Sequence, residues 1–370
     1  MLVDFLDLKR QYINLKDEID RVVIKVLSDG HYILGNNVAD FERAFAEYCG
    51  SKYAVGVGSG ADALFLSLVS CNVKSGDEVV TVSNTALATV NAISRTGATP
   101  VFADVDSRTL TMDPDDLQRK ITSRTKAVVP VHLYGRPCDM DRLTRISNAG
   151  NISIIEDACQ SHGAKYNGRK AGTMGELGCF SFYPTKNLGG YGDGGMILTD
   201  SKTKYEELLK LRYYGMGKEG KGELPGMNSR LDEVQAAILL VKLGYLDAWN
   251  DKRRALSEYY IEHLRELPVA LPILDEGDGN VFHLFVMRTK RRDELKNCLA
   301  SCGIGTLVHY PVNIHLHPVY SYLGMQKGFL PISETASEEI LSLPLYPEIG
   351  LDEMDCVIKK IRDFFSGSTA

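Results

Sequence analysis

Between residues 52 and 200 the sequence alternates short apolar runs with longer amphipathic stretches. The apolar runs are rich in Val, Ile and Phe and are bounded by Gly, Asp or Ser, which is typical of buried strands. They are YAVGVGSG, DEVVTVS, TPVFADVD, KAVVPVHLYG, ISIIEDA, CFSFYPT and GGMILTD. Stretches with helical spacing, such as ADALFLSLVSC, TALATVNAISRTG and DMDRLTRISNAG, separate several of them. The alternation predicts an α/β fold with a mostly parallel sheet that helices cover on both faces.

The pattern changes after residue 200. Residues 229–267 have helical spacing throughout and predict one long helix that ends near Pro268. The following stretches VFHLFVMRTK, DELKNCLASCGI and EMDCVIKKIRDFF indicate a smaller α+β unit. The residues before about 50 predict helices that pack on one of the two units. We therefore expect a large domain at 1–250 and a small C-terminal domain at 251–370.

Composition narrows the class of protein. The chain has 370 residues and a net charge of -6, which argues against nucleic acid or an anionic membrane as the main partner. The first stretch, MLVDFLDLKRQYINL, mixes charged with apolar residues, unlike a signal peptide, and no run of apolar residues is long enough for a membrane span. Eight scattered cysteines predict reduced thiols in a cytoplasmic protein. Cys298 and Cys302 have no second Cys or His pair nearby, so we expect no metal site.

The first chemical motif is YAVGVGSGADAL, residues 53–64, where a strand enters a glycine-rich turn and a helix. The N–H groups at a helix start bind anions, and a phosphate would suit them. Gly56, Gly58 and Ala61 also match the relaxed dinucleotide fingerprint of an NAD-dependent oxidoreductase. That fingerprint needs an acid at the end of the next strand, whereas Asp77 and Glu78 stand before it. A turn that merely packs helix against strand explains this motif alone equally well.

The second motif is IIEDACQSHGA, residues 154–164, in which a buried strand ends in Glu156 and Asp157. Gln160, Ser161 and His162 follow. An acid at this end of a parallel strand faces the ligand crevice, where a buried carboxylate requires a cationic partner such as a protonated pyridine nitrogen. Alternatively, Asp157 caps a following helix.

The third motif is CFSFYPTKNLGGYGDGG, residues 179–195. Lys186 follows Phe180, Phe182 and Tyr183 and has no charged neighbour until Asp193. A desolvated lysine amine condenses with carbonyl compounds, although many lysines at strand ends only extend to solvent. Together, a phosphate cradle, a strand-end carboxylate and a later lysine match the requirements of pyridoxal 5'-phosphate.

At the level of motifs, the sequence resembles the DegT/StrS family of sugar aminotransferases over essentially its whole length. The resemblance implies a fold-type I, aspartate-aminotransferase-like enzyme that works as a homodimer. The matching stretches are FLDLKRQY, GHYILGNNVADFERAFAEYCG, GSGADAL, VVPVHLYG, IEDACQSHGA, FSFYPTKNLGGYGDGG, LRYYGM, NSRLDEVQAAIL, VHYP and LSLPLYP.

The resemblance also implies roles for single residues. Lys186 would form the internal aldimine with pyridoxal 5'-phosphate and then serve as the acid and base of the proton shift. Asp157 would pair with the pyridinium nitrogen, and Gln160 would donate a hydrogen bond to the ring hydroxyl. The remaining implied residues bind phosphate or substrate. For the phosphate they are the backbone amides of Gly60, Ala61 and Asp62, the Ser181 hydroxyl and, from the partner subunit, Asn228; for the sugar nucleotide they are Arg230, which could meet its diphosphate, and His309 and Tyr310.

The sequence departs from the family at one position. Family members usually carry an aromatic residue that stacks on the cofactor ring, in a motif like TFIAT, whereas this chain reads TALAT with Ala86 at that position. We therefore expect weaker stacking, or stacking by another residue.

By the resemblance, the reaction moves an amino group from L-glutamate to a nucleotide-linked keto sugar in two half-reactions and releases 2-oxoglutarate. The stretches HLYGRPCDMD, EDACQSHGA and YPTKNLGGYGDGG are most similar to the branch that aminates dTDP-linked 3-keto-6-deoxy sugars, and the 4-keto branch is the alternative. The product would be an aminosugar for a surface polysaccharide, such as the O-antigen of lipopolysaccharide, or for a glycosylated metabolite. An NAD-dependent oxidoreductase and a non-catalytic regulatory protein with a retained cofactor pocket are the alternatives of other classes.

Overall fold

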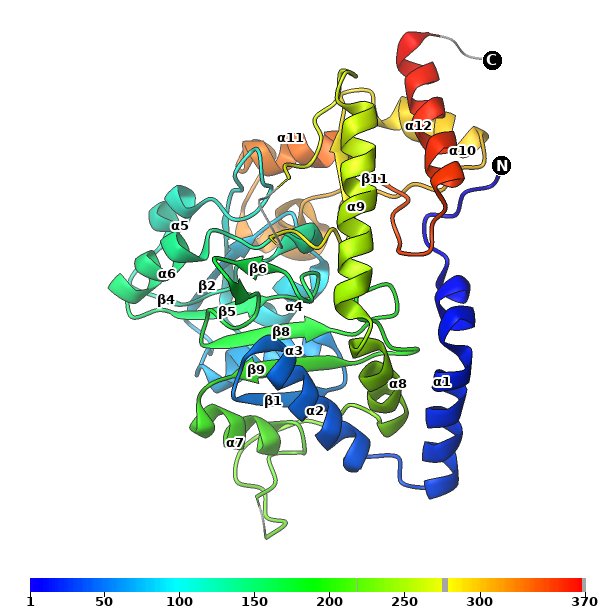
Figure 1. Cartoon of the computed structure of the whole chain (residues 1–370). Helices are drawn as coiled ribbons and strands as arrows, with labels where there is room; N and C mark the ends of the chain where they lie inside the picture. Colours follow the sequence, from blue (N-terminus) through cyan, green and yellow to red (C-terminus); the bar gives the residue numbers. More distant parts are fainter. Residues whose placement is uncertain (218, 275–278, 368–370) are drawn as a thin grey trace.

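The computed structural model describes residues 1–217, 219–274 and 279–367 (Figure 1). All seven predicted strands are present in one seven-stranded sheet of order β1-β9-β8-β5-β4-β2-β3. They are β1 (Tyr53–Val57), β2 (Glu78–Val82), β3 (Thr99–Ala103), β4 (Thr125–Val128), β5 (Ser153–Asp157), β8 (Leu177–Ser181) and β9 (Gly195–Thr199). β9 is antiparallel to both neighbours, β1 and β8, and the other neighbouring pairs are parallel. The carboxyl ends of six strands therefore meet at one edge, where ligands of such sheets bind.

Helices cover both faces of the sheet, as the alternation predicts. In β1, Val55 and Val57 pack in one cluster with Leu64 of the following helix, whereas Ala54, the residue before Val55, packs with Phe41 on the opposite face. The first face carries α3 (Gly60–Ser70), α4 (Leu87–Arg95) and α7 (Lys202–Leu211); the second carries α2 (Asn36–Cys49), α5 (Pro114–Lys120), α6 (Met140–Ala149) and α8 (Glu233–Leu243). The three layers confirm the α/β prediction.

The prediction of one helix over residues 229–267 is wrong. The structure has two helices, α8 (Glu233–Leu243) and α9 (Leu246–Leu264), with a break at Gly244. The N–H groups of Gly244 and Tyr245 bond to carbonyls three residues earlier, so the helical ladder tightens and ends there. Residues before α8 are extended because Asn228 pairs with Tyr213 and Asp232 pairs with Ile33.

A smaller unit follows along the chain. Its antiparallel strands β10 (Phe285–Arg288) and β11 (Ile340–Leu343) pack with α10 (Arg292–Ser301), α12 (Leu351–Ser366) and the C-terminal part of α9, and α11 (Pro331–Glu339) leads into β11. Shorter elements of the chain are the hairpin of β6 (Lys165–Tyr166) with β7 (Arg169–Lys170) and the 3₁₀ turns Leu133–Gly135, Ile314–Leu316 and Pro318–Leu323. Residue 250 lies inside α9, which runs beside both units in Figure 1. We propose that α9 links the two domains.

The N-terminal residues contact both units. Helix α1 (Leu8–Asp29) packs on α8 through Leu15, Ile19 and Ile238. Ahead of it, Val3 exchanges backbone hydrogen bonds with the small unit, since its N–H donates to the Gly303 carbonyl at 2.9 Å. Among the described residues, no helix has the length and hydrophobicity to cross a membrane, and no group of three or more His, Cys, Asp or Glu side chains could hold a metal ion.

A nearly buried ion pair holds β1, the outermost strand of the sheet, in place. Glu42 of α2 accepts the Gly56 N–H at 2.7 Å, and the Arg212 guanidinium contacts Glu42 and donates to the Gly56 carbonyl at 2.9 Å. The side chain of Arg212 is only 9% exposed and that of Glu42 only 12%. Arg212→Ala leaves the carboxylate without its cation, so we expect it to lower the free energy of unfolding by about 3–5 kcal/mol in chemical denaturation. Arg43→Ala breaks an exposed pair with Asp40 and should cost less than about 1 kcal/mol; equal effects would contradict the prediction.

Candidate active site

The glycine turn between β1 and α3 offers free backbone donors. The Ser59 hydroxyl caps α3 by accepting the Asp62 N–H at 3.1 Å. The N–H groups of Gly60 and Ala61 have no hydrogen-bond acceptor among the described residues. These two groups stand at the positive end of an eleven-residue helix, so they suit an anion. The Asp62 amide, which the resemblance assigns to the same set, already donates to the Ser59 hydroxyl.

The end of β8 packs directly against this turn. A Cβ added to Gly60 would lie 2.6 Å from the Ser181 Cβ and 3.0 Å from the Cys159 Sγ. A glycine is therefore required at residue 60, because a side chain there would collide with Ser181 and Cys159. The two free amides and the Ser181 hydroxyl, which lie on adjoining elements at the carboxyl edge of the sheet, are the candidate phosphate cradle.

Asp157 ends β5 and is 5% exposed. Its Oδ2 accepts the Thr89 hydroxyl at 2.8 Å, and its Oδ1 accepts the Cys159 N–H at 3.2 Å. No described residue forms an ion pair with it. The helix-capping alternative is wrong, because residues 158–164 form turns. A buried carboxylate without a cation is costly, so the position fits a cationic group of a ligand.

Gln160 brings Tyr310 to the same edge. Its Oε1 accepts the Tyr134 N–H at 2.9 Å, which leaves its amide nitrogen 3.4 Å from the Tyr310 hydroxyl. Burial and the nearby Asp157 raise the pKa of Tyr310 to about 12, so the phenol stays protonated. His309 instead lies against β11, with Nδ1 2.9 Å from the Ser342 hydroxyl, and burial lowers its pKa to about 4.

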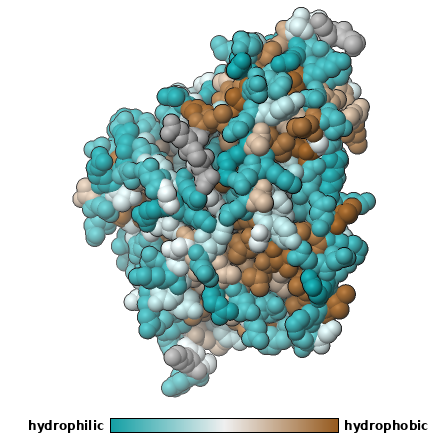
Figure 2. Space-filling view, viewed as in Figure 1, coloured by the Kyte–Doolittle hydropathy of each residue, from teal (hydrophilic) through white to brown (hydrophobic). Residues whose placement is uncertain are grey.

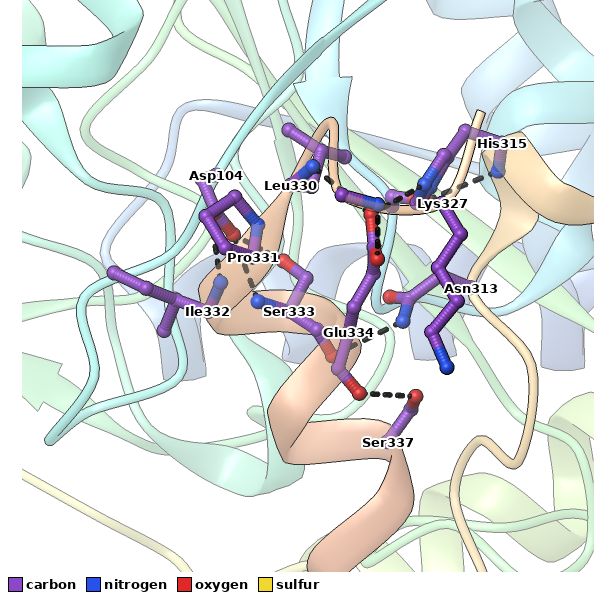
Figure 3. Close-up of polar contacts among 12 residues, drawn as sticks. Asp104, Asn313, His315, Lys327, Leu330, Pro331, Ile332, Ser333, Glu334 and Ser337 are labelled. Carbon is purple, nitrogen blue, oxygen red and sulfur yellow. Dashed lines mark hydrogen bonds and ion pairs between the residues drawn. The ribbon is translucent and has the colours of Figure 1, made fainter. Parts of the chain in front are cut away.

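The segment after Tyr310 is attached to the ends of β2 and β3 (Figure 3). Asp104, which follows β3, accepts the N–H groups of Ile332 and Ser333 at 2.9 Å each. His315 bonds to Glu334 through Nε2 at 3.1 Å and to the Ser83 hydroxyl through Nδ1 at 2.8 Å. These bonds hold residues 313–334 over the carboxyl edge of the sheet, and so they orient the Tyr310 segment.

Lys186 lies in the loop that joins β8 to β9. Its backbone N–H bonds to the Tyr183 carbonyl at 2.9 Å in a tight turn. Burial lowers the pKa of its amine below the usual 10.5, and the neighbouring Cys159 and Asp157 partly oppose that shift. Its Nζ is 3.5 Å from the Nε2 of His283, a residue that precedes β10. The amine is therefore withdrawn from solvent, and a larger share of it is neutral near physiological pH.

Residues 228–230 border the glycine turn from another side. The Ser229 hydroxyl donates to Asp62 at 2.8 Å and accepts the Gly58 N–H at 2.9 Å. Asn228 is exposed. The Arg230 guanidinium lies above two tyrosine rings, those of Tyr213 at 5.4 Å and Tyr214 at 5.8 Å. The structure thus brings this segment next to the cradle, with the Asn228 side chain open to the surroundings.

The dinucleotide-binding alternative is wrong. Glu78 begins β2, at the edge of the sheet opposite the glycine turn, and it bonds to Thr122 and Arg124 there. It is therefore too remote to hold a ribose beside Gly58.

Two contacts of the site were not anticipated from the sequence. Thr89 stands three residues after Ala86, which precedes α4, and helical spacing in TALAT could have indicated that it faces the sheet edge. His283 had no comparable signal, since it stands in the apolar run VFHLFVMRTK and meets Lys186 only through the fold.

Comparisons with known proteins identify the family of this chain. Residues 14–362 match the DegT/DnrJ/EryC1/StrS aminotransferase family. The dTDP-3-amino-3,4,6-trideoxy-alpha-D-glucose transaminase of Streptomyces venezuelae is 44% identical over 98% of this chain and 96% of its own. The crystal structure of S. venezuelae DesV in complex with a ketimine intermediate has a TM-score of 0.96, 44% identity and 98% coverage of both chains. That of ntda from Bacillus subtilis with bound cofactor PMP has a TM-score of 0.92 and 32% identity, covering 99% of this chain and 85% of its own.

These matches confirm three expectations: the fold-type I architecture, an aminotransferase activity and pyridoxal phosphate as the cofactor. On the extent of the match and the level of identity, the chain belongs to the DegT/DnrJ/EryC1/StrS aminotransferase family.

Proposed function

We propose that this protein transfers the amino group of L-glutamate to a dTDP-linked 3-keto-6-deoxy sugar. The observation that carries the reaction type is that a half-buried lysine with an amine of lowered pKa lies near Asp157, a buried carboxylate that forms no ion pair with any described residue. The 3-position and the dTDP carrier are supported by the name of the S. venezuelae relative, and a 4-keto sugar is the alternative. The product would serve a surface polysaccharide or a glycosylated metabolite.

The chain's own groups suit the cofactor's polar parts. Gly60 and Ala61 N–H groups with the Ser181 hydroxyl would hold the phosphate, and the dipole of α3 would favour its negative charge. Asp157 would hold a proton on the pyridine nitrogen. The Gln160 amide, whose oxygen is engaged by Tyr134, would donate to the ring hydroxyl. Bound pyridoxal phosphate supplies an electron sink for the substrate's α-carbon.

Lys186 would move the protons of the reaction. Because burial lowers the pKa of the amine, less free energy is needed to keep it neutral and ready to accept a proton at neutral pH. Once protonated, the same amine would return the proton to the carbon on the other side of the transferred nitrogen. Tyr310, which burial keeps protonated, would donate a hydrogen bond to the sugar nucleotide, together with His309 and Arg230.

We also propose a homodimer in which Asn228 reaches the phosphate of the partner's cofactor. Exposed aromatic side chains stand on the two loops concerned: Tyr183 and Tyr191 beside Lys186, and Tyr213 and Tyr214 beside Asn228. Figure 2 shows apolar side chains gathered on the molecular surface around α8 and the adjoining end of α9. Apolar area of this kind supports an interface with a second copy. Eight free cysteines support a reducing, cytoplasmic setting.

The visible spectrum tests the proposed function. Purified protein loaded with pyridoxal phosphate should be yellow, and L-glutamate should bleach it, because the donor's amino group is transferred to the cofactor. A dTDP-3-keto-6-deoxyhexose should then restore the yellow band. Restoration only by the 4-keto isomer would transfer the assignment to that branch. A protein that stays colourless with added cofactor would overturn the proposal and favour the regulatory alternative.

A further inference from the structure

His283 lies beside the Lys186 amine, and its other ring nitrogen is held by a chain of hydrogen bonds. The His283 Nδ1 is 3.2 Å from the Asn187 Oδ1, and the side chain is 7% exposed. Asn187 in turn bonds to Asn250, whose amide nitrogen donates to the backbone carbonyl of His162 at 2.9 Å. We refer to Asn187 and Asn250 as the amide pair.

The direction of every bond in this chain follows from its ends. The His162 carbonyl only accepts, so the atom facing it must be the NH₂ group of Asn250. The Asn250 oxygen then accepts from the NH₂ group of Asn187 at 2.9 Å, and this group also donates to the Val281 carbonyl at 3.0 Å. The Asn187 oxygen must therefore face His283, which places a proton on the Nδ1 of His283.

The imidazole is neutral in this setting. Burial lowers its pKa well below the ordinary 6.5. The pKa is lowered further by four nearby basic side chains, those of Lys186, Arg253, His309 and His162. A neutral ring with its proton on Nδ1 has a lone pair on Nε2. That lone pair faces the Lys186 Nζ at 3.5 Å.

The backbone of His283 is held as firmly as its ring. The buried Arg253 of α9 donates to the carbonyls of Phe282 and His283 at 3.3 Å each and to that of Leu345 at 3.0 Å. The adjacent Leu284 N–H bonds to the Tyr134 carbonyl at 3.4 Å, and the Tyr134 N–H bonds to Gln160. These contacts therefore fix the position of the imidazole beside Lys186.

We propose that His283, held in its Nδ1–H tautomer by the amide pair, is a positioning residue that accepts an N–H of the free Lys186 amine and so orients its lone pair. The inference deepens the proposed function, on which it rests, because the amine must stay aimed at its target whenever it is not covalently engaged. A hydrogen bond from the ammonium to Nε2 also favours the protonated form. The contact therefore opposes part of the effect of burial on the lysine.

Competitive acetylation of the apoprotein, read by mass spectrometry, measures this contact without cofactor or substrate. In His283→Phe the acceptor is lost, the pKa of Lys186 falls further, and the neutral fraction at pH 7 grows, so we expect labelling about three- to tenfold faster. His283→Gln, which again offers an acceptor, should recover most of the wild-type rate. His263→Phe, the same change on the half-buried face of α9, should leave Lys186 labelling unchanged.

Loaded enzyme supplies the second readout. In His283→Phe the rate constant of bleaching by saturating glutamate should fall about tenfold. The half-saturating glutamate concentration should stay unchanged, because the variant loses the orientation of the Lys186 amine and keeps the binding of the donor. Wild-type labelling of Lys186 in folded His283→Phe would overturn the proposal. If that variant does not fold, ¹⁵N-histidine NMR of the wild-type apoprotein decides: the neutral Nδ1–H tautomer supports the proposal, and the Nε2–H tautomer or an imidazolium overturns it. Failure of glutamate to bleach wild-type enzyme would count against the proposed function alone.

Discussion

Lys186→Ala should lower the rate of amino transfer by about 10⁴-fold or more, since in the proposed mechanism one side chain would provide both the covalent attachment and the proton transfer. The fold should survive, because the amine has one polar contact among the described residues, with His283, and alanine removes a buried amine rather than a packed apolar group. The measurement is turnover of glutamate with the keto sugar, beside thermal unfolding of the same sample. Lys186→Arg keeps the positive charge but lacks a condensing amine, so it should be equally inactive. Near-wild-type turnover in either variant would refute the role of Lys186.

The same variant tests the shared site. If Asn228 acts on the partner's cofactor, chains carrying Lys186→Ala and chains carrying Asn228→Ala complement each other, because one of the two sites in each hybrid contains both native residues. Mixing the two should restore activity toward a quarter of the wild-type value at equal proportions. Hybrid dimers that form and remain inactive would show that each site is built from one chain.

How far the sequence predicts this molecule depends on the range of the interactions involved. All seven strands of the large sheet could be predicted, because each is a buried run whose β-branched residues and flanking turns lie together in the chain. The break at Gly244 was missed because apolar spacing continues on both sides of it, and a single glycine is a weak signal against a strong periodic pattern. The extended residues 228–232 were missed for a different reason: their partners, Ile33 and Tyr213, are distant in sequence.

The candidate site divides in the same way. Residues at the ends of β1, β5 and β8 could be placed together because parallel strands bring their carboxyl ends to one edge, as for Gly60, Asp157 and Lys186. The hydrogen bond from the Asp62 amide to Ser59 could also be predicted from the sequence, because a serine three residues earlier is a common helix cap. The contact of His283 with Lys186 could not be predicted, since the two residues are 97 positions apart and only the packing of the small unit brings them together.

Asp157→Asn should separate catalysis from stability. The amide is nearly the same size and can still accept the Cys159 N–H and donate to the Thr89 hydroxyl, and it removes a buried charge that forms no ion pair with any described residue. We therefore expect the free energy of unfolding of the apoprotein to stay within about 1 kcal/mol of wild type. The rate of glutamate bleaching should fall about 10²–10³-fold, because a neutral amide would not stabilise the proton that the proposed mechanism needs on the pyridine nitrogen.

The matched control is another buried aspartate with a structural role. Asp116 of α5 accepts the Asp104 N–H at 2.6 Å and pairs with Arg119. Asp116→Asn should therefore lower the free energy of unfolding by about 1–3 kcal/mol and leave the bleaching rate close to wild type. A loss of bleaching rate in Asp157→Asn alone, with a loss of stability in Asp116→Asn alone, would establish that the Asp157 charge serves the reaction and does not stabilise the fold. If Asp157→Asn bleached at the wild-type rate, or lost stability as Asp116→Asn is expected to, the carboxylate would have a structural role and the cofactor's nitrogen would require another partner.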